Sequence, residues 1–573
     1  MLEQLTDKFF CRGLRTFIAI AFIFAPLYTY QNQGWPSLAL PYNTSAWIIF
    51  SWLISTGIFI ISSRKVLIYP AIWPFVFFFP VIILLSSLFS NTNDPIDWLF
   101  RQLFILGGAA FLLALFQFDL SERQKDNLLY VFIVAAGCQA LISFFQILSP
   151  DMLPSWLNKQ PNSTVPRGTF QQVNVLASFL VTGLTICLYV ISRPSFKSRS
   201  LWLKYFLILV FGLCVYVTIA SGSRVGLLSL LTSLPIILLA RWKHYSRQKY
   251  ILVVLIVASI VGSIGGKGGF SKTVDKTLQM KDAQYSAARV SMYTIGLELV
   301  AKEPLSGYGI GSFLKTWNKQ SADFFQRYPE ANLPLVIEHP HNEILFWMIE
   351  GGLLALSGIL LVFVGLMISI YKCGFERGAA YFSMLFPITL HTQVEHPMYT
   401  SSLHWFLWLF LVFLILRHRV KVKNISLSTG ITRLINVFAL VFSVFVTVSM
   451  IQIARAENEL FNFVYYPEKQ KPPYLQLALN NIYTKQMAEY KAMSANLYSS
   501  IESQNLEGVK LFEDWANQVI LKKPYLFIYK DLIAASITLR PEGNGCDAIL
   551  RAHQMYPHIK KLTISYEKCQ LSN

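Results

Sequence analysis

Apolar residues occur along the chain in long runs that are separated by short polar segments. A membrane-spanning helix needs roughly 20 mostly apolar residues, because the backbone must satisfy its own hydrogen bonds in lipid. We therefore predict an all-α polytopic integral membrane protein. Thirteen runs are predicted to span the membrane, at 14–30, 45–62, 66–89, 99–118, 128–149, 173–192, 201–220, 224–240, 250–266, 343–371, 378–394, 401–416 and 431–453.

Basic residues between these runs predict the orientation of the chain. Connections rich in Lys and Arg alternate with connections that hold few or none, and basic loops stay in the cytoplasm. The loops at 31–44, 90–97 and 395–400 contain neither Lys nor Arg and are assigned to the outer side. The N-terminus is then cytoplasmic. The first run, 14–30, has no small-residue cleavage site after it and is expected to remain as a targeting span.

Two polar segments are long enough to be functional parts, and the odd number of spans places both on the outer side. Segment 267–342 is too long for a simple connector and is predicted to carry a helix of its own. The tail 455–573 has several helical runs, and its spacing of Ala and Tyr resembles tetratricopeptide packing. We expect a transmembrane catalytic domain at 1–454 with a large periplasmic loop, followed by a small periplasmic helical domain.

Composition and charge narrow the classes of function. Hydrophobic residues make up 54% of the chain and charged residues only 14%, which excludes an ordinary soluble enzyme. The net charge of +18 comes from short basic loops between apolar runs, so it indicates membrane topology and membrane lipids as partners, with no role for nucleic acid.

The seven cysteines include no CxxC pair, so neither a metal centre nor a redox site is expected. Cys546 and Cys569 differ from the others because both lie in the polar tail. If this tail faces an oxidising compartment, the two thiols can form a disulfide; otherwise they stay free.

The densest group of polar residues is 338–343, with the sequence Glu-His-Pro-His-Asn-Glu, where the long outer segment returns to the membrane. A histidine there can accept a proton near neutral pH, which suits activation of a hydroxyl nucleophile. Two alternatives stay open. The group can simply solvate a helix start with Asn342 as its cap. The His-x-His spacing of His339 and His341 can also bind a metal if a third histidine from 391–404 comes close.

Two arginines oppose the orientation bias, Arg224 at the outer end of a span and Arg289 within the long outer segment. A phosphate or pyrophosphate in the outer leaflet would account for both through charge-assisted hydrogen bonds. The alternative is that they reach up to lipid headgroups. Arg167 begins a polar stretch before the sixth span that can bind an anion or cap the helix. The run 307–311, Gly-Tyr-Gly-Ile-Gly, lacks the strand and the Lys of a nucleotide loop, and we interpret it as a tight turn.

Four motifs follow one another along the second to fourth fifths of the chain. They are Gly168-Thr169-Phe170-x-Gln172-x-Asn174-x-x-Ala177, Ser223-Arg224-x-Gly226, Pro304-x-x-Gly307-x-Gly309-x-Gly311 and His341-Asn342-x-x-Leu345. Taken together in this order, they resemble the O-antigen ligase superfamily over residues 160–410. The 172–174 Gln-x-Asn segment, the loop 395–399 and the long outer tail resemble most closely the bacterial O-oligosaccharyltransferases that glycosylate pilins.

This resemblance implies a GT-C-like glycosyltransferase of the bacterial inner membrane. Its donor would be an oligosaccharide on undecaprenyl pyrophosphate in the periplasmic leaflet, its acceptor a Ser or Thr of a pilin-like protein, and it would need no metal or other cofactor. His341 would be the catalytic base, and Arg224 and Arg289 would bind the pyrophosphate. The remaining candidates for substrate binding are Gln172 and Tyr399 by resemblance, together with His339, Asn174, Arg167 and His404.

Two kinds of alternative stay open. The same chemistry can serve another acceptor, either lipid A core, as in O-antigen ligation, or a second glycan repeat, as in a polymerase. A transporter of lipid or polysaccharide would make no bond, and it would show charged residues in mid-membrane or broken helices in symmetric halves.

Overall fold

The computed structural model describes residues 2–34, 37–90, 94–157, 163–279, 283–334, 337–467 and 474–572, and within them the chain is a predominantly helical, multi-pass membrane protein. In these ranges nine helical stretches are long and apolar enough to cross a membrane. They are Phe10–Leu27, which begins in α1 (Leu2–Ala19), α2 (Pro41–Arg64), α4 (Pro95–Gln117), α5 (Glu122–Leu148), α6 (Val173–Ile191), α7 (Leu201–Ala220), Trp242–Gly265, which comprises α9 (Trp242–Tyr245) and α10 (Lys249–Gly265), α14 (Glu343–Lys372) and α18 (Thr429–Tyr465).

The other four predicted runs fall on shorter helices. These are α3 (Trp73–Ser86), α8 (Arg224–Ala240), α15 (Phe375–His391) and α17 (Ser402–Leu416). The run predicted at 66–89 is wrong in its first part, because Val66–Pro70 forms strand β1 and pairs antiparallel with β2 (Val420–Asn424). The sequence Val-Leu-Ile-Tyr-Pro is apolar enough to look like membrane helix, yet its β-branched and aromatic residues also favour a strand.

Contacts within the chain divide it into two compact units. The first comprises 1–77, 105–277 and 361–454, and the second comprises 78–104, 278–360 and 455–573. Helices α3, α4, α14 and α18 each contribute to both units.

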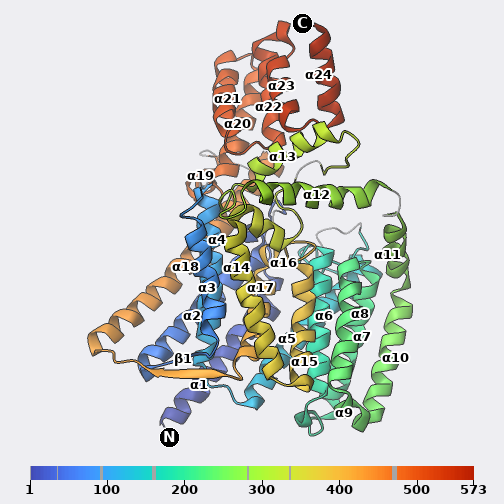
Figure 1. Ribbon diagram of the computed structural model, residues 1–573, viewed down its shortest axis with the longest axis vertical. Coiled ribbons are helices and arrows are strands. Elements are labelled where there is room, and N and C mark those ends of the chain that lie inside the picture. Colours follow the sequence, from blue (N-terminus) through green and yellow to red (C-terminus); the bar gives the residue numbers. More distant parts are fainter. Residues whose placement is uncertain are drawn as a thin grey trace. The chain divides into compact units, whose positions relative to one another are not determined.

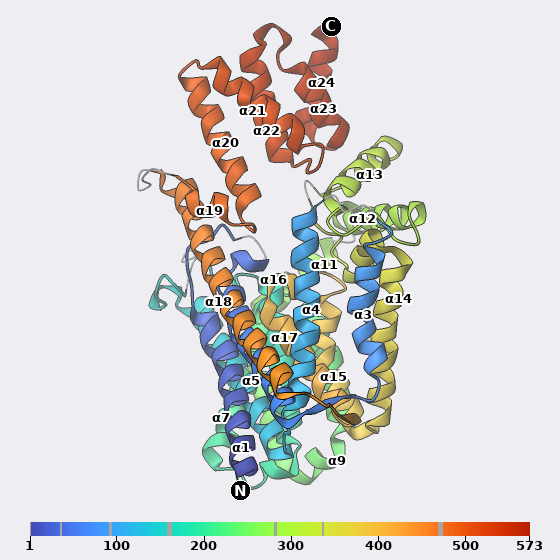
Figure 2. The ribbon, with the colours of Figure 1, turned by 90° about the vertical axis from the view of Figure 1, so that its left-hand side faces the viewer.

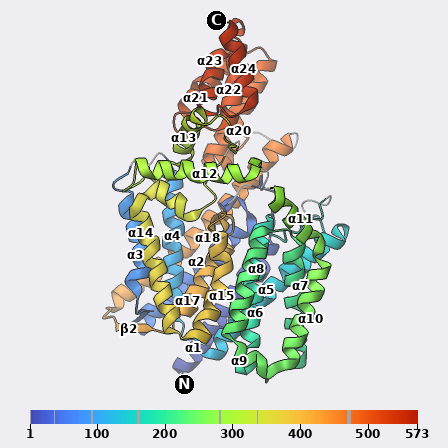
Figure 3. The same ribbon diagram turned by 45° about the vertical axis from the view of Figure 1, so that its right-hand side comes forward.

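Helix α6 forms the centre of the first unit. All of its residues from Val175 to Ile191 are buried, and α5, α7, α8 and α15 pack against it. Helix α10 packs along α7, as Figures 1 and 3 show. Helix α18, orange in Figure 2, contacts α2, since Trp52 Nε1 of α2 donates to Thr447 Oγ1 at 3.1 Å. A helix that is apolar all round is buried in this way by other helices, whereas α10 and α18 keep large apolar faces exposed for lipid.

The second unit contains two helices of the long polar segment, α12 (Ala283–Lys302) and α13 (Phe313–Arg327), with the first half of α14. Their shared core includes Ile295 from α12, Phe313 and Trp317 from α13, and Phe346 from α14. The helix predicted within segment 267–342 is therefore confirmed by α12. A further helix, α11 (Lys267–Gln279), precedes it in the chain.

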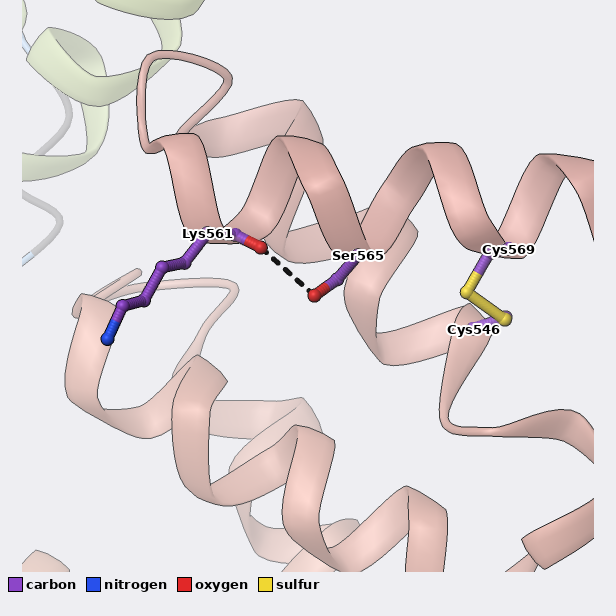
Figure 4. The surroundings of a disulfide bond; sticks show 4 residues. All are labelled: Cys546, Lys561, Ser565 and Cys569. Atoms are coloured by element: carbon purple, nitrogen blue, oxygen red, sulfur yellow. Dashed lines mark hydrogen bonds between the residues drawn. A yellow bond between two sulfur atoms is a disulfide. The ribbon is translucent and has the colours of Figure 1, made fainter.

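Six helices follow α18 and complete the second unit, and α20 to α24 pack each against the next (Figure 1). Figure 4 shows that Cys546 and Cys569 join the last two in a disulfide, so the bridge that the sequence left open is formed. The tetratricopeptide-like packing stays a prediction. The six helices are α19 (Gln476–Asn480), α20 (Lys485–Glu502), α21 (Leu506–Val519), α22 (Leu526–Leu539), α23 (Cys546–Met555) and α24 (Lys560–Ser572).

Candidate functional site

The polar stretch before α6 is a turn that α5 holds in place. The backbone N–H groups of Arg167 and Gly168 both donate to Gln146 Oε1 at 2.9 Å, and the N–H of Thr169 donates to Gln139 Oε1 at 3.0 Å. The left-handed φ of +63° at Gln171 is unusual for a residue other than glycine and turns the chain into the helix. Because amide side chains of a buried helix fix this turn, the side chains that follow it have defined positions.

The carboxylate of Glu395, just after α15, accepts hydrogen bonds from polar side chains at the start of α6. Glu395 Oε2 accepts from Gln172 Nε2 at 2.9 Å, and Glu395 Oε1 accepts from Asn174 Nδ2 at 2.7 Å. His391 Nε2 lies 3.1 Å from Glu395 Oε2. The Glu395 side chain stays partly exposed while His391 is fully buried, so the cluster connects the interior of the helix bundle with its surface.

Two buried histidines extend this cluster inward. The Ser178 hydroxyl lies 2.9 Å from His391 Nδ1 and 3.2 Å from His404 Nε2, and His404 Nε2 also lies 3.0 Å from the Val175 carbonyl oxygen. All distances are satisfied if His391 Nε2 donates to Glu395, Ser178 donates to His391, and His404 donates to Ser178 and Val175. His404 is fully buried, so it contacts the turn before α6 from within the bundle.

Arg224 is the first residue of α8, and the residue before it belongs to the same network. Ser223 donates from Oγ to Asn174 Oδ1 at 2.7 Å and accepts the N–H of Gly226 at 3.0 Å, which caps the helix. Arg224 itself is exposed. The Cβ that an alanine would add at Gly226 would lie only 2.6 Å from the Ala177 Cβ, so α8 needs glycine here to pack against α6.

Tyr399 lies on the short helix α16 (Pro397–Thr400), which is anchored to α2. The carbonyl oxygen of Thr400 accepts from Tyr42 Oη at 3.1 Å and from Asn43 Nδ2 at 2.9 Å. The Tyr399 ring packs edge-on against His396 with 5.6 Å between ring centroids. Although they are far from α16 in sequence, two residues of α2 therefore fix the loop that carries Tyr399.

A cavity of about 240 Å³ opens beside the turn before α6. This is slightly below the range of roughly 300–1,000 Å³ that is usual for ligand pockets. Its lining combines the aromatic residues Tyr28, Tyr42 and Trp156 with polar groups that include Arg167 and Gln171. Aromatic faces and hydrogen-bonding groups around one small space suit a polar, ring-shaped ligand.

The two histidines of the group 338–343 lie together in the second unit. Their ring centroids are 4.5 Å apart, and the backbone N–H of His341 donates to His339 Nδ1 at 3.2 Å. This bond makes Nδ1 of His339 an acceptor, so its proton is on Nε2. His341 has a left-handed φ of +53°, a strained conformation for a non-glycine residue of the kind that gathers at functional sites. Asn342 caps α14, as the alternative interpretation of this group expected, because its Oδ1 accepts the N–H of Leu345 at 2.9 Å.

Helix α14 is broken at Gly352, whose φ of 61° and ψ of −157° are open only to glycine. The run 307–311 crosses the break: Tyr308 N–H donates to the Ile349 carbonyl at 3.0 Å and Gly309 N–H to the Glu350 carbonyl at 2.9 Å. Gly307, Gly309 and Gly311 all have positive φ, which confirms the interpretation of this run as a tight turn. The turn supplies donors to carbonyls that the broken helix leaves without their usual partners.

A fully buried carboxylate lies at this break. Glu350 pairs with Arg101 of α4, and its Oε1 accepts the N–H groups of Gly311 and Phe313, both at 3.1 Å. Arg101 also contacts Asp97 at 2.8 Å, and its guanidinium lies 4.4 Å from the centroid of the Phe346 ring. Every charge in the group therefore has a partner, which a buried ion pair requires.

The helices after α18 also contact this region of the second unit. Lys523 Nζ lies 2.5 Å from Asp94 Oδ2, and Asn318 Nδ2 donates to the Tyr556 hydroxyl at 2.7 Å. Burial, together with the carboxylates of Glu338, Asp97 and Asp94, raises the pKa of Tyr525, so this phenol stays neutral. The loop between α21 and α22 is thus held beside the segment that carries the two histidines.

The structure brings some of the predicted site residues together and leaves other predictions open. Gln172, Asn174 and His404 share the Glu395 cluster, and His339 contacts His341. Arg289 lies half-buried on α12, which packs against the start of α14 where Gly296 meets Leu345. Arg224 belongs to the first unit, whereas Arg289 and His341 belong to the second. That these three residues act in one reaction stays a prediction.

Sequence reasoning assigned no role to Ser178, Arg101 or Glu350. It named Glu395 only as part of the loop 395–399, and His391 only as a possible metal ligand. Local signals existed for two of them: His391 precedes Glu395 by four residues, and Asp97 precedes Arg101 by the same distance, which on a helix brings such side chains together.

Comparisons with known proteins agree with this membrane fold. A family model described as "O-Antigen ligase" matches residues 207–362, and one described as "Virulence factor membrane-bound polymerase, C-terminal" matches residues 379–568. A relative from Acinetobacter baylyi (strain ATCC 33305 / BD413 / ADP1), named general O-oligosaccharyltransferase, is 21% identical over 291 residues, which cover 48% of this chain and 48% of the relative. The chain therefore spans about half the length of this curated relative.

The long apolar helices define a multi-pass membrane protein, and polar side chains cluster at several of its helix ends. The matched segment gives this class a likeness: residues 207–362 are similar to the O-antigen ligase family.

Proposed function

We propose that this protein is an O-oligosaccharyltransferase that moves a glycan from undecaprenyl pyrophosphate to a Ser or Thr of a periplasmic protein such as a pilin. It would act in the bacterial inner membrane with its active site and C-terminal helices on the periplasmic side. The observation that carries the proposal is the O-antigen ligase match over 207–362, because this segment contains Arg224, Arg289 and His341.

In the proposed reaction His341 accepts the proton of the acceptor hydroxyl while the oxygen attacks the anomeric carbon. The new bond joins this oxygen to the sugar, and the bond from the sugar to the pyrophosphate breaks with inversion. Arg224 and Arg289 balance the charge that develops on the leaving pyrophosphate. A general base contributes about 100- to 10,000-fold, and charge stabilisation is usually at least as large. Replacement of Arg224 is therefore expected to slow transfer as much as replacement of His341.

The contacts of His341 support the role of a base. Its left-handed backbone is supported by the bond to His339, and the adjacent Asn342 fixes the start of α14. A side chain held by its neighbours loses little freedom when it binds substrate. We assign His339 and Tyr399 to substrate binding in the same proposal.

We also assign the cavity beside the turn before α6 to one sugar ring of the glycan. Trp156 and Tyr28 offer aromatic faces, and Arg167 and Gln171 offer hydrogen-bonding groups. The neighbouring Gln172 faces Glu395 instead, so this turn separates the cavity from the Glu395 cluster.

The acceptor is the part of the proposal with a specific rival. The match of 379–568 to a membrane-bound polymerase model favours a second glycan as acceptor, and the O-antigen ligase match favours lipid A core, whereas the relative named general O-oligosaccharyltransferase favours a protein. Deletion of the gene separates them. Loss of the glycan mass from pilin, with unchanged lipopolysaccharide laddering, supports the protein acceptor; altered laddering with unchanged pilin contradicts it.

A transporter is the rival from another class, and the break in α14 at Gly352 is a feature that transporters share. Purified protein reconstituted in liposomes with lipid-linked glycan and an acceptor peptide distinguishes the two. A glycosylated peptide, formed without added nucleotide or metal, supports the proposal. Movement of the lipid-linked glycan across the bilayer without a new glycosidic bond contradicts it.

A further inference from the structure

The two oxygens of Glu395 have separate partners. Oε2 accepts from Gln172 at 2.9 Å and lies 3.1 Å from His391 Nε2, whereas Oε1 accepts from Asn174 at 2.7 Å. A carboxylate is the one side-chain group that offers acceptors alone at both oxygens. The Asn174 amide must therefore present its NH₂ group to Glu395, and its orientation is decided by the charge of its partner.

The orientation of the Asn174 amide determines the hydrogen bonds of Ser223, the residue before α8. With its NH₂ group engaged, Asn174 turns its carbonyl oxygen to Ser223, whose hydroxyl must then be the donor over 2.7 Å. The Ser223 oxygen keeps a lone pair for the N–H of Gly226 at 3.0 Å, and this bond caps the helix that Arg224 begins. Each hydrogen bond from Glu395 to the helix cap thus has only one possible direction.

We infer that Glu395 is a positioning residue, which acts through Asn174 and Ser223 to hold the first turn of α8 so that Arg224 meets its anionic ligand. The inference rests on the proposed role of Arg224 toward pyrophosphate. Glu395 lies after α15, Asn174 near the start of α6 and Ser223 before α8, so three helix ends are joined at one point.

The network predicts an unusual pattern of loss and recovery. Glutamine in Glu395→Gln keeps only one acceptor oxygen. Gln172 and His391 both use the Oε2 side, so we expect the oxygen to stay there and the new NH₂ group to face the NH₂ group of Asn174. If the Asn174 amide then flips, Ser223 loses the oxygen to which it donates. Asn174→Asp instead places a second carboxylate against Glu395. The double variant Glu395→Gln/Asn174→Asp exchanges amide and carboxylate. The new amide at 395 then donates to the new carboxylate at 174, the reverse of the wild-type direction, and this carboxylate accepts from Ser223 as Asn174 does.

The test measures the affinity of the full-length protein in nanodiscs for inorganic pyrophosphate by calorimetry, beside the rate of glycan transfer. We expect each single variant to bind pyrophosphate about tenfold more weakly, as loss of one buried hydrogen bond of about 1.4 kcal/mol implies. The double variant is expected within threefold of the wild type. Asp151→Asn, which changes an exposed carboxylate elsewhere in the first unit, is the matched control and is expected to bind like the wild type.

A double-mutant cycle separates positioning from general stability. If Glu395 acts through Arg224, then Glu395→Gln has no further effect on pyrophosphate affinity in an Arg224→Ala background. Single variants that bind like the wild type, a double variant as weak as the singles, or full additivity with Arg224→Ala would each overturn the inference. A wild type that transfers no glycan contradicts the proposed function, whereas transfer that Glu395→Gln leaves unchanged contradicts this inference alone.

Discussion

The disulfide between Cys546 and Cys569 allows a quantitative prediction about the end of the chain. The two cysteines are 23 residues apart and join the first residue of α23 to α24. Helix α24 packs on α23 with Leu562 buried and with the Tyr566 ring stacked 4.2 Å from His553. A loop of this length restricts the unfolded segment by about 3.4 kcal/mol in the chain-entropy treatment. Removal of the bridge should therefore raise the population in which α24 is detached by about 300-fold.

Hydrogen exchange of the full-length protein, followed by mass spectrometry, measures this population. The amides of α24 in Cys546→Ser/Cys569→Ser are expected to exchange about 300-fold faster than in the wild type. Cys373→Ser, which removes a thiol that is not bridged, is the control and should leave exchange in α24 unchanged. An increase below fivefold would refute the reasoning, because contacts of α24 with α23 would then hold the helix without the bond.

Three further predictions concern the break in α14, the buried ion pair and the cavity. Gly352→Ala should lower the free energy of unfolding by about 3 kcal/mol or more, because its Cβ would collide with the Leu305 carbonyl. The control is Gly212→Ala, whose Cβ would meet Ala258 at 3.6 Å and which should be neutral or stabilising. Thermal unfolding measures both. Arg101→Met should cost about 3–5 kcal/mol by leaving the Glu350 charge unpaired, and Arg101→Met/Glu350→Gln should recover most of that loss in the same assay. Trp156→Ala should raise KM for the lipid-linked glycan severalfold with kcat unchanged. An unchanged KM would contradict the assignment of this cavity to a sugar ring of the glycan.

Most of the membrane fold could be predicted because the length and polarity of each run decide whether it crosses lipid. Each of the thirteen predicted runs contains a helix, although the run 66–89 begins with a strand. The strand Val66–Pro70 could not be found in this way. Its partner Val420–Asn424 lies some 350 residues further along, and pairing over such a separation leaves no local pattern in the sequence.

The sequence predicted those candidate site residues that lie within one short motif. It did not predict the partners of these residues that come from distant parts of the chain. Gln172 and Asn174 were singled out by the motif before α6, but the acceptor they share comes from Glu395, 223 and 221 residues away. Arg101 was hidden inside an apolar run, and its partner Glu350 is 249 residues away. The left-handed backbone of His341 also leaves no sign in the sequence, because no glycine marks it.

Transfer of glycan to an acceptor peptide in liposomes, compared between the wild type and His341→Ala, tests the central claim most directly. His553→Ala, a histidine on α23, serves as the control. We expect the wild type and the control to glycosylate the peptide, and His341→Ala to be slower by at least about 100-fold, the lower end of what a general base contributes. Transfer by His341→Ala at the rate of the wild type would contradict the central claim.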